Sequence, residues 1–143
     1  MRALIQRVSH VRVEGETVGA IGPGLLVLVD VARADGPEDV SYLAGKIPHL
    51  RLFSQRDQHF SLSILDSGGS VLVVSQFTLY AETRKGRRPS FSLSAPGDQA
   101  APLIESLASQ LQAAGLHVET GRFGALMQVE LVNEGPVTLV LER

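Results

Sequence analysis

A short apolar run that passes directly into polar residues constrains the fold of this chain most. Residues 71–74 are four consecutive aliphatic side chains, and this pattern predicts a strand buried on both faces. Ser75, Gln76 and Thr78 follow without a break. If the strand continues, alternation places Gln76 and Thr78 on one face and Phe77 on the other, where it anchors the strand. The polar end of the strand predicts the floor of a ligand pocket, although an edge strand facing water fits the pattern equally well.

Length and composition are typical of one globular domain. The chain has 143 residues and a mass of 15.3 kDa, with 44% hydrophobic residues and a net charge of -2. A single domain over residues 1–143 is predicted. Cysteine is absent, which excludes disulfides and thiol chemistry and fits a cytoplasmic location. The longest apolar run, residues 25–29, is too short to cross a bilayer, so no membrane association is expected.

The remaining patterns predict about eight strands and two helices. One helix begins near the acidic, proline-containing residues 35–39, and the other runs from Pro96 to a glycine at position 115. Besides the run at residues 71–80, apolar or alternating segments predict strands at residues 2–13, 17–21, 25–29, 51–53, 61–65, 117–119, 125–132 and 137–141, with a hairpin turn at 14–16. A parallel α/β fold needs a helix after most strands. We therefore predict an α+β fold, an antiparallel barrel-like sheet that carries two helices.

The residues with chemical potential do not form a familiar catalytic set. The four histidines share no ligand spacing, so neither a metal nor another cofactor is predicted. Ser75 and Thr78 have no histidine or lysine within the same motif to accept a proton. A hydroxyl nucleophile therefore remains an alternative that needs a partner brought close by folding, such as His10.

A cluster of positive charge follows the predicted pocket. Arg84, Lys85, Arg87 and Arg88 fall within five positions. Such a loop suits contact with phosphates, and a solvated surface loop is the alternative. Because the whole chain is slightly acidic, general affinity for nucleic acid, and for DNA in particular, is not expected.

Two motifs carry a resemblance to a known family. They are residues 75–80, Ser-Gln-Phe-Thr-Leu-Tyr, and residues 133–138, Asn-Glu-Gly-Pro-Val-Thr. Together they closely resemble the signature motifs of the D-aminoacyl-tRNA deacylases. The similarity continues through residues 1–8, 22–28, 85–91 and 121–127, and so covers essentially the whole chain. One departure is at residues 59–61, where the family more often has a lysine, a hydrophobic residue and an asparagine.

The resemblance implies a homodimer with a composite site. Gly135 and Pro136, joined by a cis peptide bond, would enter the pocket of the partner subunit and reject L-amino acids by steric exclusion. The catalytic positions implied are Ser75, Gln76, Phe77 and Thr78. The supporting positions implied are Arg7, which would brace the Gly-Pro turn, Asn133, Phe123 and Met127. Lys85, Arg87 and Arg88 would contact tRNA.

The reaction implied is hydrolysis of the ester of D-aminoacyl-tRNA. Backbone N–H groups near Phe77 and Thr78 would stabilise the oxyanion, and the substrate's ribose 2′-hydroxyl would assist the attacking water, with no cofactor. Glycine has no side chain to exclude, so glycyl-tRNA mischarged on tRNA(Ala) would also be cleaved. The alternatives are an RNA-binding module without activity and an esterase that uses Thr78 covalently on small esters.

Overall fold

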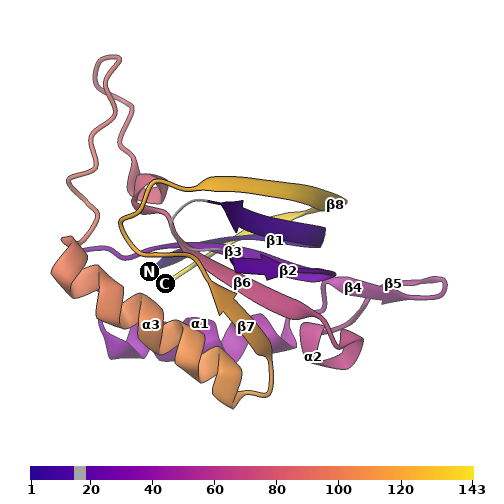
Figure 1. Ribbon diagram of the computed structural model, residues 1–143. Helices are drawn as coiled ribbons and strands as arrows, with labels where there is room; N and C mark the ends of the chain where they lie inside the picture. The colour runs from indigo at the N-terminus through magenta and orange to yellow at the C-terminus, as the bar shows by residue number, and fades with distance from the viewer. Residues whose placement is uncertain (15–18) are drawn as a thin grey trace.

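The computed structural model describes residues 1–14 and 19–143, and a six-stranded sheet with helices on one face is its main feature (Figure 1). The strands of this sheet are β1 (Arg2–Glu14), β2 (Gly19–Ile21), β3 (Gly24–Asp30), β6 (Ser70–Ser75), β7 (His117–Thr120) and β8 (Gln128–Glu142). The α-helices are α1 (Pro37–Lys46), α2 (Ile64–Ser67) and α3 (Gly97–Ala113), and the 3-10 turns are η1 (Ile47–His49) and η2 (Phe77–Tyr80). Strands β4 (Phe53–Gln55) and β5 (Gln58–Leu62) form a separate hairpin.

Strand β1 connects the sheet because it pairs with three other strands. It pairs antiparallel with β3 through residues 2–8 and with β2 through residues 11–13, while β8 pairs antiparallel with it from end to end. Beyond β3 the sheet continues through β6 to β7. The sheet curls around its inner face, and the α+β, barrel-like architecture is confirmed (Figure 1).

The strand directions differ from the prediction in one respect. The pairs β3–β6 and β6–β7 are parallel, so the sheet is mixed and not antiparallel throughout. Parallel neighbours require a crossover connection, and the two long predicted helices lie in these crossovers, α1 between β3 and β6 and α3 between β6 and β7. A third, four-residue helix, α2, replaces the end of the strand predicted at 61–65. It forms because Ser63 and Asp66 make a capping box, with Ser63 Oγ accepting from Asp66 N at 3.2 Å.

The two apolar runs are buried on both faces, as their sequences predict. In β3, Val27 and Val29 face the core under α1 and α3, while Leu26 faces the second core inside the curl. In β6, Val73 and Leu72 divide in the same way between the first and second cores. Strands β3 and β6 therefore form the rigid centre on which both layers pack.

The last strand also differs from its prediction. Strand β8 is one strand of 15 residues, not two strands joined by a turn. The segment around Asn133 is instead an irregularity, since the register with β1 shifts twice between Gln6 and His10. The hairpin turn predicted at 14–16 lies mostly outside the described residues.

Gly24 tests the close contact between β3 and β6. A Cβ at this position would lie 1.9 Å from the Ser70 carbonyl oxygen, and real Cβ atoms do not approach backbone so closely. We expect Gly24→Ala to lower the free energy of unfolding by about 3 kcal/mol or more, in the range of severe core disruption. Chemical denaturation measures the change. Gly22→Ala is the matched control, because nothing lies within 4 Å of its added Cβ, and equal stability of the two variants would contradict this packing.

Candidate active site

The strand predicted to continue to Tyr80 ends at Ser75, and a 3-10 turn, η2, follows it. Gln76 leaves the strand direction with φ -144° and ψ 75°, while its N–H still donates to the Val29 carbonyl at 2.8 Å. Phe77 and Thr78 are the first residues of the turn, and the amides at the start of a helical turn have no intrahelical acceptor. Two adjacent N–H groups are therefore available to a ligand.

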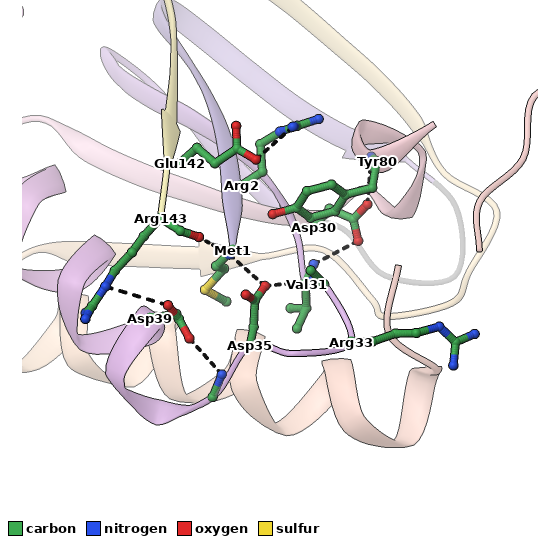
Figure 2. A network of polar contacts seen from close by, with 12 residues as sticks. Met1, Arg2, Asp30, Val31, Arg33, Asp35, Asp39, Tyr80, Glu142 and Arg143 are labelled. Carbon is green, nitrogen blue, oxygen red and sulfur yellow. Dashed lines mark hydrogen bonds and ion pairs between the residues drawn. The ribbon is translucent and has the colours of Figure 1, made fainter. Parts of the chain in front are cut away.

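The backbone of η2 is held at three points. Arg2 Nη1 donates to the Leu79 carbonyl at 2.6 Å, the Ser94 hydroxyl contacts the Phe77 carbonyl at 2.7 Å, and the Tyr80 N–H donates to Asp30 Oδ2 at 3.1 Å. The Arg2 guanidinium also lies over the Tyr80 ring, 4.4 Å from its centroid (Figure 2). These contacts come from β1, from the end of β3 and from the segment before α3. The turn is therefore fixed from several sides.

Burial shifts the ionisation of two side chains in this region. Desolvation raises the pKa of the Asp30 carboxyl group above its usual value, although its hydrogen bonds and Arg2 oppose the shift. Desolvation, with the negative charge of Asp35 and Glu142 nearby, raises the pKa of Tyr80 to about 12. The Tyr80 phenol therefore stays neutral at physiological pH.

A cavity of about 250 Å³ opens beside η2. Its lining residues come from β3, the end of β6, η2, α3 with the segment before it, and the loop after β7; they are Val29, Asp30, Ser75, Gln76, Phe77, Phe91, Ser94, Ala95, Gly97, Ala100, Ile104, Phe123 and Gly124. A smaller cavity of about 120 Å³ adjoins it and shares Ser75, Ile104 and Phe123. Among the described lining residues of the larger cavity, Asp30 is the only ionisable side chain. The walls are mostly apolar, and the polar groups gather on the side of η2.

Three of the four predicted catalytic residues line this cavity, and Thr78 is not among its lining residues. Ser75, Gln76 and Phe77 line it, and Gln76 Nε2 donates to the Thr78 hydroxyl at 2.5 Å. The prediction that Phe77 anchors a strand from beneath is wrong. Its side chain is 60% exposed and meets Phe91 edge to face at 5.1 Å, because the chain has already turned into η2.

Two of the supporting residues, Phe123 and Met127, belong to the segment between β7 and β8 and have different surroundings. Phe123 lines both cavities, whereas Met127 packs against the second core with Val74. Met127 also approaches Gly121, where an added Cβ would lie 3.0 Å from its sulfur. Phe123 thus contacts the cavity directly, and Met127 supports the wall behind it.

The segment at Gly135 and Pro136 is braced within its own chain but does not line the cavity. The peptide bond between these residues is cis, and both residues are exposed. Arg7 Nε donates to the Glu134 carbonyl at 3.2 Å, and Asn133 Nδ2 donates to the Arg7 carbonyl at 2.9 Å. Arg7 therefore contacts this segment within its own chain, and its functional role stays a prediction. The described lining of the cavity contains neither Gly135 nor Pro136.

The basic loop projects away from the sheet above η2 (Figure 1). Its two limbs are joined by backbone hydrogen bonds between Glu82 and Ser90. Arg84 is paired with Glu82, and this pairing lowers the pKa of Glu82 to about 2. The three cations predicted to contact tRNA are exposed; they are Lys85, Arg87 and Arg88.

Asp30 is the residue in the cavity that sequence reasoning missed. It follows the buried run at residues 25–29 directly, and an acid at the end of a fully apolar strand is the signal that was available.

The alternative general base, His10, is exposed on β1, with Nδ1 3.3 Å from the Ser9 hydroxyl. Among the described residues, no cluster of three His, Asp or Glu side chains suited to a metal ion was found. In the same part of the chain, no helix has the length and apolar character needed to span a membrane.

Comparison with known sequences gives one consistent family. The model of the family described as D-Tyr-tRNA(Tyr) deacylase matches residues 4–142. A D-aminoacyl-tRNA deacylase from Chloroflexus aurantiacus is 58% identical over 99% of this chain and 90% of its own length. Another from Heliobacterium modesticaldum is 56% identical over 99% of this chain and 96% of its own length.

Solved structures agree on the fold. One, named c-Myc DNA Unwinding Element Binding Protein, is 38% identical and superposes with a TM-score of 0.91 over 100% of this chain and 99% of its own. A second, titled as a probable eukaryotic D-amino acid tRNA deacylase, has a TM-score of 0.84 at 18% identity, over 98% of this chain and 97% of its own. The second likeness supports the fold alone.

Proposed function

This chain belongs to the D-Tyr-tRNA(Tyr) deacylase family, and on that premise we propose that the cavity beside Phe77 and Thr78 is where it hydrolyses the ester of D-aminoacyl-tRNA. It is a hydrolase of the D-aminoacyl-tRNA deacylase type. The observation that carries the assignment of the site is the pair of amides at the start of η2, anchored on three sides and next to a mostly apolar cavity.

The proposed mechanism uses backbone groups to stabilise charge. Hydrogen-bond donors held in place lower the energy of a developing oxyanion most when they need no reorganisation. The N–H groups of Phe77 and Thr78 serve this role on the ester carbonyl oxygen, and water attacks with help from the substrate's ribose 2′-hydroxyl. Since Asp30 is already engaged in hydrogen bonds with Val31, Tyr80 and Ser94, it is not assigned as the base.

The proposed chiral filter is the Gly135-Pro136 segment of a partner subunit. Its exposure, and its bracing by Arg7 and Asn133, suit a rigid element that meets another surface. Exposed apolar side chains on the same strand, Val132 and Val140, suit a homodimer contact. A rigid backbone segment excludes L-amino acids by steric conflict, which discriminates between enantiomers better than weak apolar attraction does. It has nothing to exclude in glycine, so glycyl-tRNA mischarged on tRNA(Ala) is also a proposed substrate.

The proposed macromolecular partner is the acceptor end of tRNA. Lys85, Arg87 and Arg88 are exposed on a loop that begins directly after η2, and phosphate contacts of this kind position a nucleic acid without reading its sequence. A tRNA substrate and the lack of cysteine fit work in the cytoplasm.

The activity test compares the two hands of one substrate. With D- and L-tyrosyl-tRNA, we expect release of D-tyrosine and protection of the L-ester. Thr78→Ala should slow the reaction by no more than about tenfold, the effect of one lost hydrogen bond, because the variant loses the bond that the Thr78 hydroxyl accepts from Gln76. Binding of tRNA without release of D-tyrosine would leave only the RNA-binding alternative. A loss on the order of 10⁶-fold, as for a removed nucleophile, would instead support the covalent esterase.

Gly135→Ala tests the role of the Gly-Pro segment. An added Cβ would meet nothing closer than Asn133 Oδ1 at 3.8 Å within the chain, so the free energy of unfolding should change by less than about 0.5 kcal/mol. If the segment enters a partner's cavity, the methyl group displaces the substrate, and D-tyrosyl-tRNA hydrolysis should fall by about 10²-fold. Light scattering measures whether the dimer persists.

The matched control for this variant is Gly45→Ala, whose added Cβ in α1 also lies in open space. Full activity of Gly135→Ala in an unchanged dimer would exclude this segment as the filter.

The basic loop is tested by changing Lys85, Arg87 and Arg88 to Gln together. Affinity for tRNA should fall, and the slope of log K against log salt should become shallower by about 2 to 3, because each lost phosphate contact removes about 0.7–0.9 from the slope. Arg84→Gln is the control, since Glu82 already occupies that guanidinium. Duplex DNA serves as a competitor, because one structural neighbour is named for binding DNA. Equal binding of DNA and tRNA would contradict the proposed partner.

A further inference from the structure

The buried carboxyl group of Asp30 joins three separate segments of the chain. Its side chain sits at the end of β3, and the residue is only 3% exposed. Oδ1 accepts from the Val31 N–H at 2.8 Å, and Oδ2 accepts from the Tyr80 N–H at 3.1 Å (Figure 2). The Ser94 hydroxyl, from the segment before α3, lies 2.8 Å from the same Oδ2. One carboxyl group thus links the end of β3, the catalytic turn η2 and a wall of the cavity.

The Ser94 hydroxyl has one hydrogen and two acceptors. Its Oγ lies 2.8 Å from Asp30 Oδ2 and 2.7 Å from the Phe77 carbonyl oxygen. Both distances are those of O–H···O hydrogen bonds, and each bond needs a hydrogen between its oxygens. Ser94 supplies one of them. A protonated Asp30 can supply the other, by donating to Ser94 through Oδ2 while Oδ2 also accepts from the Tyr80 N–H.

The surrounding charges are compatible with a neutral acid. The cation facing Asp30 is Arg2 on β1, and its guanidinium is engaged by Glu142 of β8 at 2.8 Å and by the Leu79 carbonyl. Asp35, after β3, is paired with the Met1 amino group at 2.6 Å, and Tyr80 of η2 stays neutral with a pKa of about 12. Arg2 therefore divides its charge between Asp30 and Glu142, and burial raises the pKa of the Asp30 carboxyl group against the effect of Arg2.

We propose that Asp30 and Ser94 are positioning residues for the catalytic turn, through a chain of hydrogen bonds in which Asp30 donates to Ser94 and Ser94 donates to the Phe77 carbonyl. This inference rests on the proposed function of the Phe77 and Thr78 amides. The Phe77 carbonyl and the Thr78 N–H belong to one planar trans peptide unit, in which they point in opposite directions. A bond that fixes the carbonyl therefore also fixes the direction of the N–H.

The same carboxyl group holds the far end of the turn through Tyr80. Loss of the Ser94 hydroxyl leaves Asp30 in place but frees the 77–78 peptide unit to rotate. The oxyanion donor is then present in the wrong orientation for part of the time.

The first test is Ser94→Ala, with Ser92→Ala as the control on the same segment, since Ser92 is exposed. On D-tyrosyl-tRNA, kcat of Ser94→Ala should fall by about 10- to 100-fold, somewhat less than complete loss of an oxyanion donor, while KM changes less than about twofold. Ser94→Thr, which keeps a hydroxyl, should restore most of kcat. A rise in KM at constant kcat, or no rescue by threonine, would overturn the assignment.

The second test is the pH profile of kcat, corrected for spontaneous ester hydrolysis. As pH rises through the folded-state pKa of Asp30, the carboxylate takes the only hydrogen of Ser94, and the Phe77 carbonyl loses its donor. The wild-type protein should lose kcat over that range, and Ser94→Ala should lack this step. The free energy of unfolding should change in the same direction as kcat. An acid whose pKa is raised by folding stabilises the protein at pH values below its unfolded-state pKa, and this stabilisation is lost as pH rises through the folded-state pKa. Parallel profiles in the two proteins would overturn the proposal.

The third test needs no substrate, so its result does not depend on whether the proposed function is correct. Carbon-13 NMR should give a pKa for the Asp30 carboxyl group above the usual Asp value, and Ser94→Ala should increase hydrogen exchange and exchange broadening of the Thr78 amide. An Asp30 pKa at or below the usual value, or an unchanged Thr78 amide, contradicts the positioning role even if the enzyme is active. If neither hand of tyrosyl-tRNA is hydrolysed while both NMR results appear, the chain of hydrogen bonds stands and the assigned reaction fails.

Discussion

The parallel pairing of β3 with β6 is the constraint on which the rest of the site depends. Parallel neighbours end at the same edge of a sheet, and here Val29 lies opposite Ser75 in the last pair of the register. The next residue along each chain segment, Asp30 at the end of β3 and Gln76 just after β6, therefore lies at the same edge of the sheet. An antiparallel pair would have sent them to opposite edges. The close contact of Gly24 with Ser70 at the other end of the same pair keeps this register.

The difference between sequence and structure follows from the same pairing. The apolar runs in β3 and β6 predict two strands buried on both faces, because their composition leaves no polar face, and both are found. Strand direction is a non-local property that no local pattern contains, and the antiparallel expectation was wrong for this pair. An antiparallel arrangement does not place Asp30 beside Ser75, so the sequence patterns did not predict this acid at the cavity.

A hydrogen bond from a distant residue explains why the chain turns after β6 instead of continuing as a strand. Beyond Ser75 the neighbouring strand β3 extends by one residue, Asp30, and its side chain accepts the Tyr80 N–H in place of a ladder partner. The alternating pattern at residues 76–80 therefore does not form a strand, because a hydrogen bond to a side chain 50 positions away stabilises the turn. The segment at 133–136 shows the opposite outcome. Its composition predicts a turn, yet pairing with β1 on both sides keeps it within one long strand.

A site built from backbone amides has a particular physical requirement. A side-chain catalyst carries its own chemistry, and its neighbours mainly tune it, whereas a peptide N–H has the same chemistry everywhere and differs only in direction and desolvation. The residues that decide activity in such a site are those that hold the peptide plane. Around η2 these are Arg2, Asp30 and Ser94, and none of them lies in the motif at residues 75–80. Since a peptide plane can rotate at little cost when its carbonyl is unbonded, each carbonyl bond in the turn also controls the orientation of the next amide.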